Sequence, residues 1–180
     1  MRSIVLRPII LAASVLAAAC SDQVSSAPTS PTSVALAPTQ TQRNATRLPL
    51  RGSFTAADRS TFAPPNLLLQ GTGDGNATHL GRFTVAIAEV VSLATSSGTG
   101  TFDLTAADGD QLFATTAGAE DQFTPPNVSH VTLVATIVGG TGRFASATGT
   151  FTMERTATIN FAAGTSTSFG SFEGHIDLNK

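Results

Sequence analysis

The residues of the segment GTFTMERTATINF, 149–161, alternate between apolar and polar side chains. Successive side chains of a β-strand point to opposite faces, so this period of two predicts a strand with one buried face. The predicted buried face carries Phe151, Met153, Ala157, Ile159 and Phe161, with Arg155 among them. An unpaired charge away from water is very costly. Arg155 therefore has either a partner inside the fold or, at a bulge or strand end, a route to water.

Seven further segments share this short apolar pattern, and none from residue 47 onward shows the 3.6-residue period of a helix. They are residues 47–54, 66–73, 77–93, 100–106, 110–118, 129–139 and 168–178. Turn residues such as Asp108–Gly109 and Gly139–Gly140 separate the segments. Short strands joined without crossover helices predict an all-β fold with an antiparallel meander.

An internal repeat bears on whether the predicted sheet has free edges or closes into a barrel. FAPPN at 62–66 returns as FTPPN at 123–127, and the motifs GTG and GxFT follow in the same order in both halves. Two related halves of four strands predict an eight-stranded closed barrel, which leaves no exposed sheet edge. Chance similarity in a chain rich in Gly and Thr is the alternative explanation of the repeat.

The stretch VGGTGRFASATGTF, residues 138–151, resembles the GGTGxFxxAxG signature of the allene oxide cyclase and dirigent barrels. The resemblance implies an eight-stranded barrel with an apolar lumen that is often trimeric, so a homo-oligomer is expected. Plant members act on lipophilic molecules, by cyclising an epoxy fatty acid or by steering phenoxy-radical coupling. Gly139, Gly140 and Gly142 are expected to adopt positive φ at a tight corner and so let Phe144 return to the core.

The first twenty residues, MRSIVLRPIILAASVLAAAC, read as a secretory signal peptide with a basic start, a short apolar run and small residues. The run is too short to span a bilayer, which takes about 20 apolar residues. Cys20, the single cysteine, follows three alanines, and this resembles the lipobox of bacterial lipoproteins, in which the cysteine carries an acylated diacylglyceryl group (palmitate, for example). The alternative is an ordinary secretory signal with a chance cysteine.

The expected organisation has three parts: a signal peptide at 1–19, a lipidated Cys20 with a flexible tether to residue 46, and a barrel domain at 47–180. The tether is rich in Ser, Thr, Pro and Ala and has no sustained period, so it cannot bury enough apolar surface to fold. The predicted location is the bacterial cell envelope. The outer membrane or cell surface is favoured over the inner membrane, because Ser21 is not the aspartate that retains such proteins there in some bacteria.

Composition argues against several functions. Removing Arg2 and Arg7 with the signal peptide leaves eight basic groups against twelve acidic ones, with no basic cluster for nucleic acid. The chain has no tyrosine, its only lysine is Lys180, and no GxSxG elbow occurs. No cofactor or metal is expected. Glu173, His175 and Asp177 share one strand face, but neighbours two residues apart stand about 7 Å from each other, too far to converge on one ion.

A second apolar stripe also carries a charge. Phe83, Val85 and Ile87 share a face with Glu89, and His79 shares it if no bulge intervenes at Gly81. We expect Glu89 and Arg155 to meet, or both to line a wet lumen, at comparable depth in the two halves. The predicted ligand-lining residues are Glu89, Arg155, His79, Phe83, Ile87 and Met153.

The leading hypothesis from the sequence is a lipoprotein whose barrel binds a lipophilic small molecule in its lumen. One alternative is an isomerase or cyclase that uses Glu89 as its acid/base group, with His79 or Arg155 polarising the substrate; no catalytic residue is assigned beyond that hypothesis. Another is a structural or interaction module of the envelope, and a lumen filled by phenylalanines would favour it.

Overall fold

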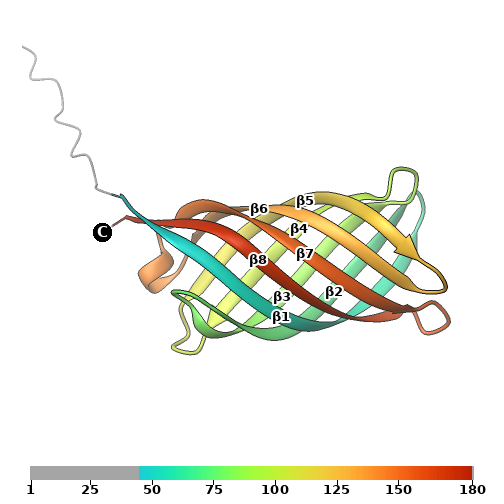
Figure 1. Ribbon diagram of the computed structural model, residues 1–180, viewed down its shortest axis with the longest axis horizontal. Coiled ribbons are helices and arrows are strands. Elements are labelled where there is room, and N and C mark those ends of the chain that lie inside the picture. The colour runs from blue at the N-terminus through green and yellow to red at the C-terminus, as the bar shows by residue number, and fades with distance from the viewer. Residues whose placement is uncertain (1–44, 180) are drawn as a thin grey trace, which may run out of the picture. The chain divides into compact units, whose positions relative to one another are not determined.

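The computed structural model describes residues 45–179, which form one closed barrel of eight antiparallel strands in chain order (Figure 1). The strands are β1 (Ala45–Ala63), β2 (Asn66–Ala77), β3 (Gly81–Ser92), β4 (Ser97–Ala106), β5 (Gln111–Thr124), β6 (Val128–Gly140), β7 (Thr148–Asn160) and β8 (Thr165–Asn179). The predicted all-β antiparallel barrel is confirmed. The signal peptide, Cys20 and all but the last two residues of the expected tether lie outside the described residues.

The strands run further than the sequence pattern predicts, and one predicted strand is two. β1 continues nine residues beyond Phe54, to Ala63. The segment 77–93 is broken by a turn at Thr78–Leu80, where His79 adopts φ +66°. Positive φ ends the pleat and its alternation, so the parity expected for His79 does not hold, and the side chain is exposed in the turn.

The barrel has two different ends. The end that carries the β2–β3, β4–β5 and β6–β7 connections is called the closed end below. Ala45 of β1 also pairs with Asn179 of β8 there. The open end carries the other four connections, including the two halves of the repeat: Pro64–Pro65 joins β1 to β2, and Pro125–Pro126 joins β5 to β6. The repeated motifs thus mark equivalent hairpins at one end of the barrel.

Phenylalanine rings and glycines fit together in the half of the lumen toward the closed end. Three rings lie over glycines of neighbouring strands: a Cβ would stand 2.4 Å from the ring of Phe172 at Gly52, 2.6 Å from that of Phe83 at Gly75, and 2.5 Å from that of Phe54 at Gly170. An eight-stranded barrel is just wide enough for side chains to fill. Alternating large and absent side chains is how this lumen accommodates its aromatic residues.

The closed end is capped by the connection that carries the glycine-rich signature. Gly139 and Gly142 have positive φ, at 128° and 52°, and a short 3-10 helix η1 (Gly142–Phe144) follows. Phe144 is fully buried, as predicted from its place in the signature. Gly140 does not have positive φ; a Cβ there would stand 2.0 Å from the carbonyl oxygen of Gln111, so the position needs glycine for space.

Candidate functional site

Glu89 and Arg155 form a buried ion pair that spans the lumen. An Nη2 hydrogen of Arg155 is donated to Oε2 of Glu89 over 2.8 Å, and both side chains are 5% exposed. Glu89 comes from β3 and Arg155 from β7, four places apart in a ring of eight strands and therefore on opposite walls. The predicted meeting of the two charges is present, and the pair acts as a crossbar between the walls. We call it the crossbar below.

The crossbar leaves polar atoms without protein partners. Oε1 of Glu89 and both Nε and Nη1 of Arg155 are buried and have no hydrogen bond within residues 45–179. Buried polar atoms are hydrogen-bonded in most proteins, because an unmade bond in a low-dielectric interior is costly. One free acceptor and two free donors at one place are therefore a candidate binding point for a polar group.

The crossbar separates a packed half of the lumen from an open one. A cavity of about 220 Å³ lies on its open-end side, with Glu89 and Arg155 in its lining. The walls are mainly apolar; they include Leu67, Leu69, Val91, Val131, Leu133, Ala157 and Ile159. Small-molecule pockets usually measure about 300–1,000 Å³ and combine apolar walls with a few polar groups. This cavity is small but has that composition.

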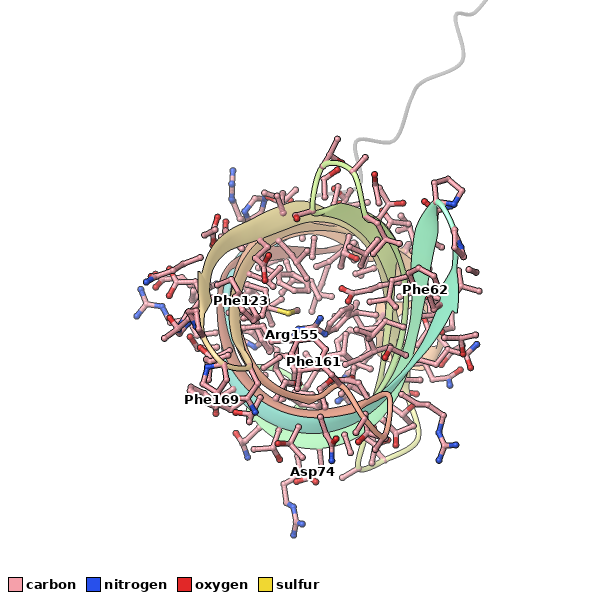
Figure 2. All side chains as sticks on the ribbon, turned by 90° about the vertical axis from the view of Figure 1, so that its right-hand side faces the viewer. Phe62, Asp74, Phe123, Arg155, Phe161 and Phe169 are labelled. Atoms are coloured by element: carbon pink, nitrogen blue, oxygen red, sulfur yellow. The ribbon has the colours of Figure 1, made fainter. Side chains whose placement is uncertain are left out.

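Exposed apolar side chains lie at the open end of the barrel. Phe62, Leu93, Phe123 and Phe161 lie at or next to the open-end connections and are 42–69% exposed. Viewed from the open end, Arg155 lies within the ring of strands, with the labelled phenylalanines Phe62, Phe123 and Phe161 toward the viewer (Figure 2). The sequence pattern placed Phe161 on the buried face of its strand. That was wrong, because β7 ends at Asn160 and the ring belongs to the following turn.

The remaining predicted site residues do not line this cavity. Phe83, Ile87 and Met153 are 1–3% exposed and belong to the hydrophobic core. Ile87 and Met153 precede the crossbar residues by two positions on β3 and β7, which places them on its closed-end side. Their side chains fill the lumen there and pack against the closed-end side of the crossbar. His79 lies outside the lumen.

Asp58 is a further buried charge that the sequence pattern missed. Asp58 on β1 is 4% exposed, and its Oδ2 accepts hydrogen bonds from the hydroxyls of Ser168 at 3.1 Å and Ser166 at 3.4 Å. Its Oδ1 has no partner within residues 45–179 and lies over Gly71, where a Cβ would stand 1.9 Å away. Asp58 shares parity with Leu50, Phe54 and Ala56, and this alternation was the signal available in the sequence.

The acidic and histidine side chains near the C-terminus belong to the outer surface. Arg51 on β1 donates a hydrogen bond to Glu173 over 2.6 Å, and Nη2 of Arg47 lies 3.0 Å from the ring of His175. Among residues 45–179, no group of three or more His, Cys, Asp or Glu side chains is arranged to hold a metal ion. Glu173 and His175 instead form cross-strand pairs between β1 and β8, and Asp177 lies 3.7 Å from His175 on its own strand.

Comparison with known proteins assigns neither a family nor a function to this chain. No protein-family model matches the chain, and no curated protein matches it. The solved structure of a pterocarpan synthase dirigent protein is similar, with 12% sequence identity, a TM-score of 0.47, and an alignment covering 84% of this chain and 100% of that one. At this identity and TM-score, the similarity says nothing about the ligand or activity of this chain. No helix among residues 45–179 is both long and apolar enough to cross a membrane.

Proposed function

We propose that this protein is a cell-envelope lipoprotein whose barrel binds a lipophilic small molecule in the open half of its lumen. The observation that carries the binding proposal is the apolar cavity with the crossbar in its lining. The walls would hold the apolar body of the ligand, and the free atoms of Glu89 and Arg155 would hold its polar head. The exposed rings at the open end would provide an apolar entry path.

The alternatives from the sequence have less support. The isomerase hypothesis named His79 or Arg155 as the group that polarises the substrate. His79 lies in an exposed turn, and Arg155 is already engaged by Glu89. A purely structural module would have a lumen filled along its length, whereas here the phenylalanines fill only the half below the crossbar.

Filling the cavity should weaken binding. Ala157 follows Arg155 by two positions on β7, is 7% exposed and lines the cavity. Ala157→Phe is expected to weaken the affinity for octan-1-ol, a neutral apolar probe, by about tenfold or more in calorimetric titration. Thr158→Phe puts the same ring on the outer face of the same strand and serves as the matched control. Equal affinity of both variants and the parent would show that octan-1-ol does not bind in this cavity.

The lipoprotein part of the proposal rests on residues 1–20 and has its own test. The protein recovered from bacterial membranes should begin at Cys20 and carry the mass of an acylated diacylglyceryl cysteine. Cys20→Ser should release it from the membrane fraction, because a lipid chain contributes about 0.8 kcal/mol of membrane binding per buried CH₂. A parent protein without added lipid mass, or a Cys20→Ser variant that stays in the membrane fraction, would contradict the lipid anchor.

A further inference from the structure

The charges in and around the cavity do not balance. Among the charged residues that line it, Glu89 and Glu120 are acidic and Arg155 is basic. Arg155 is already paired with Glu89 at 2.8 Å. Glu120 is half-buried near the open end of β5 and has no ion-pair partner within residues 45–179. The lining thus carries one more negative than positive charge.

Asp58, a buried residue next to the cavity lining, adds a second excess negative charge. Its carboxylate is one hydrogen bond from Ser166, which lines the cavity. Its hydrogen-bonding partners, Ser166 and Ser168, carry no charge. In a low-dielectric interior a charge is screened weakly, so both excess carboxylates act on whatever enters the cavity.

The unpartnered acceptors point to the same conclusion. Oε1 of Glu89 and Oδ1 of Asp58 are buried carboxylate oxygens with no hydrogen bond in the described residues. A ligand head that brings both a positive charge and several N–H donors would satisfy Glu89 directly and lower the electrostatic cost of the buried Asp58. A carboxylate head would instead add a third excess negative charge to the same volume.

We propose that the ligand of this cavity is a cationic amphiphile, with an apolar body between the walls and a protonated amine against Oε1 of Glu89. This proposal rests on the proposed function, because it needs a ligand in the open half of the lumen. It excludes fatty acids as the preferred class, even though a free guanidinium edge is present, because Glu89 already neutralises the charge of Arg155.

The test compares three probes that share one chain and differ in charge. Octylamine, octan-1-ol and octanoate are titrated into the protein at pH 7 by calorimetry. Octylamine is expected to bind about tenfold more tightly than octan-1-ol, and octanoate more weakly than both. Octanoate binding as tightly as octylamine, or octan-1-ol binding tightest, would overturn the proposed ligand class while leaving the binding function in place. If none of the three binds, the proposed function fails and the inference fails with it.

A pair of adjacent acidic residues supplies the matched control. Glu120→Gln removes a carboxylate that lines the cavity, whereas Asp121→Asn removes one at the exposed bulge beside it on β5. Glu120→Gln should reduce the preference for octylamine over octan-1-ol about threefold, while Asp121→Asn leaves it unchanged. An equal effect of the two variants would mean that general surface charge, and not the lining of the cavity, attracts the amine.

Discussion

Arg155→Met is expected to lower the free energy of unfolding by about 3–5 kcal/mol, because it leaves the carboxyl group of Glu89 buried without its partner inside the barrel. The loss would be a large share of the total, since domains of this size have about 5–15 kcal/mol of stability. Urea unfolding measures it directly. Glu154→Gln, an exposed neighbour on the same strand, should change the stability by less than about 0.5 kcal/mol.

The double variant Glu89→Leu, Arg155→Met separates the cost of the unpaired carboxyl group from the cost of lost packing. Replacing both members of a buried ion pair by apolar residues of similar volume is often neutral or stabilising. We therefore expect the double variant to recover most of the stability lost in Arg155→Met, and to lose the polar binding point of the cavity. If Arg155→Met unfolds at the same urea concentration as the parent, the crossbar does not exist as a buried pair.

Phe144→Ala is expected to cost a similar amount, about 3–5 kcal/mol, because it empties the cap of the closed end. Phe144 is fully buried, and the guanidinium of Arg143 lies 4.6 Å from the centre of its ring. Arg143 also pairs with Asp108 and Asp110, so the ring is held beneath a surface ion-pair cluster. Phe144→Leu, which keeps most of the apolar volume, should cost clearly less.

The cap and the cavity lie on opposite sides of the crossbar. Phe144→Ala should therefore lower the stability of the barrel without lowering its affinity for octan-1-ol. Under conditions where Phe144→Ala remains folded, its affinity for octan-1-ol should stay within about twofold of the parent. A loss of affinity parallel to the loss of stability would show that the two halves of the lumen are not independent. A loss of less than about 1 kcal/mol in stability would show that Phe144 does not close the barrel.

The period of two in the sequence predicted the strands, because each strand of a closed barrel has one face toward the lumen and one face toward the outside. Each of the eight predicted segments contains strand residues, and parity placed Phe83, Ile87, Met153 and Arg155 inside. The pairing of Glu89 with Arg155 could also be predicted from the sequence, since an isolated charge on each of two apolar stripes requires a partner. The repeat placed the two charges at comparable depth, and they meet across the lumen.

The sequence predictions were wrong where the apolar–polar alternation stops, or where inward positions become polar. His79 was placed inside on the condition that no bulge intervenes at Gly81, and that condition fails because the chain turns at Thr78–Leu80 and both His79 and Gly81 have positive φ. β1 was ended at Phe54 because Asp58 and Ser60, which share its parity further along the strand, are polar and interrupt the apolar alternation. The cavity could not be predicted, because it depends on which side chains fill the lumen from opposite walls.

The most direct test of the account is to locate octan-1-ol bound to the protein by nuclear Overhauser contacts in the titration described above. We predict contacts from the octyl chain to the methyl groups of Val131 and Leu133, which line the cavity, and none to the ring of Phe144 beyond the crossbar. Contacts confined to exposed residues of the outer face, such as Phe169 and Val134, would contradict a binding site inside the barrel.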